Sequence, residues 1–173
     1  CVAAMGALAR VWLARGLARQ PNSTVVIFWL AFAIGILIKG PMVIMFTGLA
    51  ALVLSIRERS LRWLGGLRPW LGLVFVLLAV VPWFAAIAWK SGGEFYRLAV
   101  GDDMLGKVVE GQQKHGAPPG FYLVAYFATF WPGAIMAVGA IPLLFRERGE
   151  DWAAFLIAWV VPAWLVFEAV PTK

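Results

Sequence analysis

The sequence predicts an all-α fold, a polytopic bundle of transmembrane helices. Of its 173 residues, 62% are hydrophobic and only 14% are charged. Its mean hydropathy of +0.84 is far above that of soluble domains of this length. Several apolar stretches of about 16 to 20 residues follow one another, each near the length that spans hydrocarbon. A soluble core could hide one such helix but not a series, so we expect lipid to be the solvent.

The first half of the chain is predicted to hold four helical segments. They are residues 1–17, 24–38, 41–56 and 70–89. The chain opens with Cys1 and stops just after an apolar run, so we expect an internal piece whose first segment is the tail of a longer helix. The second and third segments are separated only by Lys39 and Gly40, where glycine allows a tight reversal and Pro41 suits the first position of a helix.

The second half is predicted to hold a polar loop at residues 90–119 and two further helical segments, at residues 120–145 and 152–170. Gly, Pro and charged residues mark these boundaries. Most tryptophans lie near the ends of the proposed spans, where indole rings favour the membrane interface. We expect all six segments to form a single transmembrane domain over residues 1–173.

The basic residues indicate how the helices are oriented, because cytoplasmic connections retain positive charge. One set of alternate connections holds nine arginines: Arg10, Arg15, Arg19, Arg57, Arg59, Arg62, Arg68, Arg146 and Arg148. The other set holds six basic residues: Lys39, Lys90, Arg97, Lys107, Lys114 and Lys173. The arginine side is therefore expected to be cytoplasmic. The opposite face, with the polar loop, is cationic and lysine-rich, which favours a site for an anionic group.

The net charge of +6 does not indicate a nucleic-acid partner in a membrane chain. An excess of arginine there more often orients the protein against anionic lipid, so we expect membrane lipids and no nucleic acid as partners. The single cysteine, Cys1, cannot form an internal disulfide.

Lys39 is the first candidate for binding. Apolar residues flank it for about a dozen positions on either side, and a charge placed there is costly unless it snorkels or has a partner. The start of the following helix would add N–H groups and a favourable dipole for a phosphate. The alternative is a plain hairpin whose lysine snorkels to lipid headgroups.

The polar loop contains acids, bases and the only histidine of the chain. Asp102 and Asp103 could bind a metal or act as a base, but adjacent carboxylates without further ligands are a weak metal signal, and a solvated loop explains them equally well. His115 could bind phosphate, a metal or a sugar hydroxyl, although an exposed histidine is often incidental. Glu168, at the outer end of the last segment, is expected to pair with Lys173 or another outer cation.

Five strings in the chain, taken in order, resemble a known family. They are Ile38-Lys39-Gly40-Pro41, Val81-Pro82-Trp83-Phe84, Gly101-Asp102-Asp103 with Lys107, His115-Gly116-Ala117-Pro118-Pro119-Gly120-Phe121-Tyr122, and Pro171-Thr172-Lys173. From about Thr24 to Lys173 the chain resembles the bacterial C-type membrane glycosyltransferases related to the aminoarabinose lipid A transferase and the protein O-mannosyltransferases.

The resemblance implies an enzyme of the bacterial inner membrane with its active site on the periplasmic side. Such enzymes take a sugar from a polyprenyl phosphate, usually undecaprenyl phosphate, and pass it to a lipid, glycan or protein acceptor. No cofactor is required by the resemblance, and a divalent metal is left open. The family's catalytic carboxylate lies in its first periplasmic loop, so we expect the catalytic acid upstream of Cys1, with Asp102 and Asp103 as weak candidates. Residues 1–173 alone are expected to be inactive.

The resemblance also assigns residues to the carrier phosphate or substrate. These are Lys39, Lys107, His115 and Lys173, and Arg97 is added to them as a cation of the polar loop. Lys39 matches the basic residue of the family's Lys-Gly-Pro turn, and His115 matches the histidine of its His-Gly-x-Pro-Pro string. Lys107 falls where relatives commonly carry arginine, whose planar fork lysine lacks. Met104 falls where many carry His or Asn, and it cannot replace them as a hard-metal ligand.

Two other classes of protein remain as alternatives. A transporter or flippase with a central anion site is expected to show paired, Gly/Pro-interrupted spans in two related halves, and only the turn at Lys39-Gly40-Pro41 fits that pattern. A non-catalytic membrane scaffold is expected to show small-xxx-small helix faces, which are not prominent here.

Overall fold

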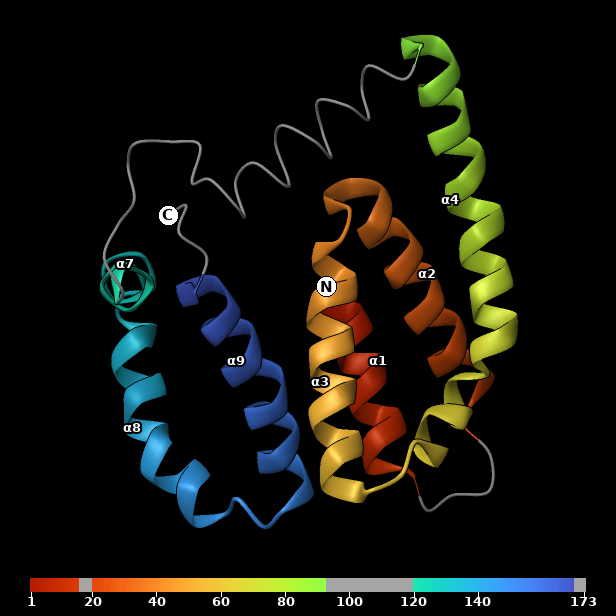
Figure 1. Ribbon diagram of the computed structural model, residues 1–173. Coiled ribbons are helices and arrows are strands. Elements are labelled where there is room, and N and C mark those ends of the chain that lie inside the picture. The colour runs from red at the N-terminus through yellow and green to blue at the C-terminus, as the bar shows by residue number, and fades with distance from the viewer. Residues whose placement is uncertain (16–19, 93–119, 170–173) are drawn as a thin grey trace. The chain divides into compact units, whose positions relative to one another are not determined.

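The computed structural model describes residues 1–15, 20–92 and 120–169, and within these ranges the chain is helical with no strand (Figure 1). The elements, in order, are α1 (Val2–Leu13), α2 (Asn22–Lys39), α3 (Met42–Glu58), the 3₁₀ helix η1 (Arg62–Leu67), α4 (Pro69–Ser91), α7 (Phe121–Thr129), α8 (Gly133–Arg146) and α9 (Asp151–Ala169). The predicted all-α fold is confirmed.

Three helices are long and apolar enough to cross a membrane, namely α2, α4 and α9. A fourth span results if α7 and α8 are taken together. Helix α1 is apolar but shorter. These lengths and compositions agree with a membrane helix bundle of several spans, whereas a partial C-type glycosyltransferase domain remains a prediction.

The chain divides into two compact units. Unit 1 comprises Cys1–Phe84 and Gly149–Ala163, and unit 2 comprises Ala85–Arg148 and Trp164–Lys173. The division falls within α4 and within α9. That residues 1–173 form a single transmembrane domain therefore stays a prediction.

The core of unit 1 forms around α1, although α1 is its shortest α-helix. Met5, Leu8, Val11 and Trp12 of α1 are almost fully buried. They pack with buried residues of neighbouring elements, namely Phe28, Val43, Ala50, Leu54, Trp63, Leu67, Phe155 and Ala158. Small and large side chains thus interlock between α1, α2, α3, η1 and α9, which fixes the ends of these helices relative to one another.

Glycines allow two close helix approaches in unit 1. A Cβ on Gly72 of α4 would overlap the indole ring of Trp29 in α2, and a Cβ on Gly35 would lie 3.0 Å from Cβ of Val43 in α3. The Trp29 Nε1–H group donates a hydrogen bond of 2.7 Å to the Leu67 carbonyl at the end of η1. Trp29 therefore joins α2 both to η1 and to the backbone of α4.

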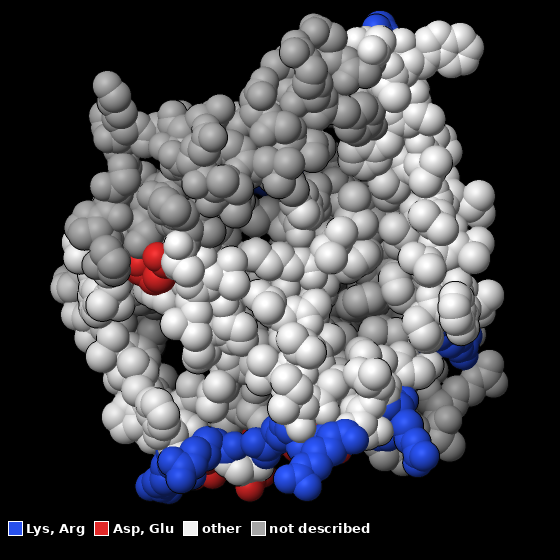
Figure 2. Space-filling model, in the orientation of Figure 1, with Lys and Arg blue, Asp and Glu red and all other residues white. Residues whose placement is uncertain are grey.

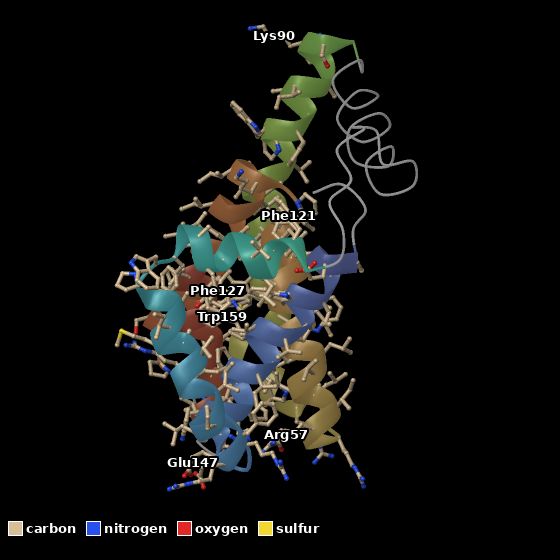
Figure 3. All side chains as sticks on the ribbon, turned by 90° about the vertical axis from the view of Figure 1, so that its left-hand side faces the viewer. Arg57, Lys90, Phe121, Phe127, Glu147 and Trp159 are labelled. Atoms are coloured by element: carbon tan, nitrogen blue, oxygen red, sulfur yellow. The ribbon has the colours of Figure 1, made fainter. Side chains whose placement is uncertain are left out.

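Unit 2 contains a break that the apolar pattern did not indicate. One helix is predicted over residues 120–145, but α7 ends at Thr129, α8 begins at Gly133, and their axes differ by 119°. Figure 3 shows α7, with Phe121 and Phe127, running across the end of α8. Pro132 has no N–H to continue the first helix and its ring clashes with the preceding turn, while as N-cap of α8 it leaves that helix intact.

Candidate functional site

Lys39 is the last residue of α2, and its side chain is exposed. The Gly40 N–H group donates to the Ile36 carbonyl at 2.8 Å and closes the helix. Gly40 then adopts φ 59°, a left-handed value that favours glycine, and α3 starts at Met42 after Pro41. The Gly-Pro pair therefore brings the end of α2 and the start of α3 together at Lys39.

The electrostatics of this turn suit an anion. The Lys39 ammonium group lies at the carboxyl end of α2, where the helix dipole favours a cation. The first turn of α3 contains no acidic residue, and no side chain of the described residues caps it, so the usual unpaired N–H groups of a helix start favour an anion there. Within residues 1–15, 20–92 and 120–169, no acidic side chain forms an ion pair with Lys39.

The other predicted site residues lie outside the described residues. They are Arg97, Asp102, Asp103, Lys107, His115 and Lys173. Met104 and the expected partner of Glu168, Lys173, lie outside them as well. The roles assigned to all of these residues stay predictions.

Glu168 makes a contact in unit 2 that the sequence pattern did not predict. Its Oε2 atom accepts a hydrogen bond of 3.0 Å from the N–H group of Gly120, the N-cap of α7. Ring contacts join the same two helices, with centroids 5.9 Å apart for Tyr122 and Phe167 and 5.7 Å apart for Tyr126 and Trp164. A carboxylate at a helix N-terminus is stabilised by the dipole, so Glu168 anchors the start of α7 to the end of α9.

The end of unit 1 where α3 finishes carries part of the row of Lys and Arg side chains along the lower edge of Figure 2. Arg15 is the centre of an ion-pair network there. It donates to both carboxylate oxygens of Asp151, at 2.8 and 2.7 Å, and to Glu58 at 3.0 Å. The hydrogen bond to Asp151 raises the pKa of the Arg15 guanidinium, outweighing the opposing effect of burial.

Two further contacts hold this end of unit 1. The Arg15 guanidinium carbon lies 4.0 Å from the ring centroid of Trp12, a cation–π contact. Arg57, labelled at the end of α3 in Figure 3, donates to the Gly149 carbonyl at 2.7 Å. The arginines that the sequence indicates only as orientation markers therefore also join α1, α3 and the start of α9.

No group of three His, Cys, Asp or Glu side chains that could hold a metal occurs in the part of the chain that the structure describes.

The chain is similar to an arabinosyl transferase. It is 26% identical over 172 residues to the undecaprenyl phosphate-alpha-4-amino-4-deoxy-L-arabinose arabinosyl transferase of Erwinia tasmaniensis. The alignment covers 98% of this chain, which spans 31% of the length of that relative. No protein-family model and no solved structure matches the chain. With the apolar helices, the similarity supports a multi-pass membrane protein with likeness to membrane glycosyltransferases.

Proposed function

We propose that the full-length protein is an integral membrane glycosyltransferase that uses a sugar linked to a polyprenyl phosphate, with undecaprenyl phosphate as the carrier. The acceptor is a lipid, glycan or protein on the periplasmic side of the bacterial inner membrane. The observation that carries this proposal is the similarity to a transferase named for an undecaprenyl phosphate-linked sugar, which extends along 98% of the chain.

In the proposed reaction, an acceptor oxygen attacks the anomeric carbon of the sugar and the bond from that carbon to the carrier phosphate breaks. The bonding electrons go to the phosphate, and the acceptor proton goes to a general base. Cations beside the leaving phosphate stabilise it as its charge develops. We assign the base to an acidic residue of the full-length protein outside residues 1–173, with Asp102 and Asp103 as the candidates within them.

Lys39 is the described residue that best suits the leaving phosphate. Its ammonium group is exposed beside the uncapped start of α3, so one turn offers a cation and N–H groups to the same anion. Arg97, Lys107, His115 and Lys173 join it as proposed phosphate or substrate contacts on the grounds of sequence alone.

The test uses the purified full-length protein in detergent, with undecaprenyl phosphate-linked 4-amino-4-deoxy-L-arabinose as donor and lipid A as the first acceptor. Mass spectrometry of the acceptor is expected to show one added sugar. Vectorial transport is impossible in detergent, so a covalent product there separates a transferase from a flippase. Movement of the lipid-linked sugar across vesicles, without a product from any acceptor class, would instead establish the flippase.

A further inference from the structure

Residues 59–68, which connect α3 to α4 in unit 1, form a two-sided segment that we call the connector. Its inward side chains, Trp63 and Leu67, are 7% and 4% exposed. Trp63 Nε1–H donates to Ser55 Oγ at 3.1 Å, and its ring meets Trp12 edge-on with centroids 5.3 Å apart. The connector is therefore packed against the helix ends rather than projecting as a free loop.

The outward side of the connector combines cations with apolar side chains. Arg59 and Arg62 are exposed, and Leu61 between them is 67% exposed. Trp70, just beyond the connector, is 80% exposed. Arginine beside leucine and tryptophan is the composition of elements that lie in a membrane interface, with rings and methyl groups at the acyl boundary and guanidinium groups among the headgroups.

The acidic side chains at this end of unit 1 do not neutralise the connector. Glu58, next to Arg59 in sequence, pairs with Arg15 instead, and Asp151 does the same. Among the residues that the structure describes, no carboxylate forms an ion pair with Arg59 or Arg62. Two guanidinium groups are thus left to bind an external anion.

The backbone gives independent support. Arg59 and Arg68, at the two ends of the connector, have φ values of 51° and 50°. Left-handed residues after a helix are usually glycine, because a Cβ is unfavourable there. A long charged side chain at a position that suits glycine points to a use for that side chain. Arg68 has such a use within the fold, since its Nη2 donates to Asn22 Oδ1 at 2.9 Å. Arg59 has none among the described residues.

We propose that the connector is a binding surface for anionic phospholipid headgroups, with Arg59 and Arg62 holding the phosphate and Leu61 and Trp70 entering the interface. A guanidinium group binds phosphate through two parallel hydrogen bonds. A soluble phosphate would use the arginines but would leave the exposed Leu61 and Trp70 without a role, so the combination favours a lipid. This surface is independent of the proposed sugar transfer.

The test uses the full-length protein, delipidated in detergent and titrated with phosphatidylglycerol or phosphatidylcholine. Native mass spectrometry counts bound lipid, and thermal unfolding follows stability. Phosphatidylglycerol is expected to bind more tightly and to raise the Tm, and added salt is expected to weaken both effects. Arg59→Gly and Arg62→Gln are each expected to weaken phosphatidylglycerol binding about fivefold.

The variants separate binding from folding. Without lipid, Arg59→Gly is expected to keep or raise the Tm, because glycine suits the backbone at residue 59. Arg146→Gln is the matched control, since Arg146 is 81% exposed but already pairs with Glu147 at 3.3 Å. It is expected to retain phosphatidylglycerol binding.

Three results would overturn the proposal. The first is equal affinity of the wild-type protein for phosphatidylglycerol and phosphatidylcholine. The second is a loss of binding in Arg59→Gly and Arg62→Gln no larger than in the control. The third is an equal Tm shift with inorganic phosphate, which would make free phosphate the ligand. If Arg59→Gly fails to fold, Arg62→Gln alone decides the second point.

Discussion

Arg15 and Asp151 form a two-pronged ion pair across 136 residues of sequence, with Nη1 and Nη2 of the arginine each bound to one carboxylate oxygen. The pair joins the chain just after α1 to the first residue of α9. Trp12 Nε1–H donates a further hydrogen bond of 3.4 Å to the Asp151 carbonyl. Parallel hydrogen bonds of this kind fix direction as well as distance, so the contact sets how α9 starts against α1.

Replacing Arg15 is expected to loosen this junction. Because Arg15 and Asp151 are 24% and 42% exposed, solvent screening limits the effect of Arg15→Gln to about 1 to 2 kcal/mol of unfolding free energy. Arg15→Lys keeps the charge but not the fork, and an intermediate loss is expected. Thermal unfolding in detergent measures both. Arg10→Gln, exposed on α1, is the control, and an equal loss there would show that the network contributes nothing specific.

Gly72→Ala is expected to destabilise the contact between α2 and α4, because the added methyl group overlaps the Trp29 ring. Overpacking of this kind typically lowers the unfolding free energy by about 1 to 3 kcal/mol. Gly48→Ala in α3 is the matched control, since nothing lies within 4 Å of its added Cβ. Tm values for both variants check the contact, and similar values would argue against close approach at Gly72.

Glu168→Ala is expected to make the start of α7 open more often, because it removes the acceptor for the Gly120 N–H group. Faster hydrogen exchange at Gly120, measured by mass spectrometry, is the expected sign. Glu168→Gln keeps an acceptor oxygen and should restore most of the protection. Glu147→Ala, after α8, is the control. Unchanged exchange in Glu168→Ala would mean that the ring contacts alone hold α7 in place.

If the proposed sugar transfer is correct, Lys39→Ala is expected to lower kcat/KM for the lipid-linked donor. Loss of a charge-assisted contact to phosphate corresponds to about 10- to 100-fold. Lys39→Arg retains the charge and should keep much of the activity. Lys90→Ala, an exposed lysine in the last turn of α4, is the control. Wild-type turnover in Lys39→Ala would leave the lysine as a headgroup anchor.

The helices could be predicted from the sequence largely because apolar runs of membrane length end at charges, glycines and prolines. The break between α7 and α8 could not, because proline alone is an ambiguous signal in this chain. Pro82, Pro142 and Pro162 lie inside continuous helices, whereas Pro132 lies between two. Whether a proline interrupts a helix depends on the packing around it, which no local pattern reports.

The candidate site could be predicted where it depends on local chemistry, but not where it depends on how distant helices pack. The turn at Lys39 follows from local chemistry, because Gly40 and Pro41 impose their own backbone preferences. The contacts of Arg15 with Asp151 and of Glu168 with Gly120 join residues far apart in sequence. Such contacts depend on how whole helices pack, and a single charged residue carries no signal of its partner.

The two acidic partners of Arg15 are also synthesised at different times. Glu58 follows Arg15 by 43 residues and Asp151 by 136, so at ordinary rates of translation the second partner is made roughly ten seconds later. During that interval the ion pair with Glu58 can join the end of α1 to α3, while the Arg15 guanidinium group still has unused donors. The ion-pair network of Arg15 can therefore be completed only after the start of α9 has been made, because Asp151 is its first residue.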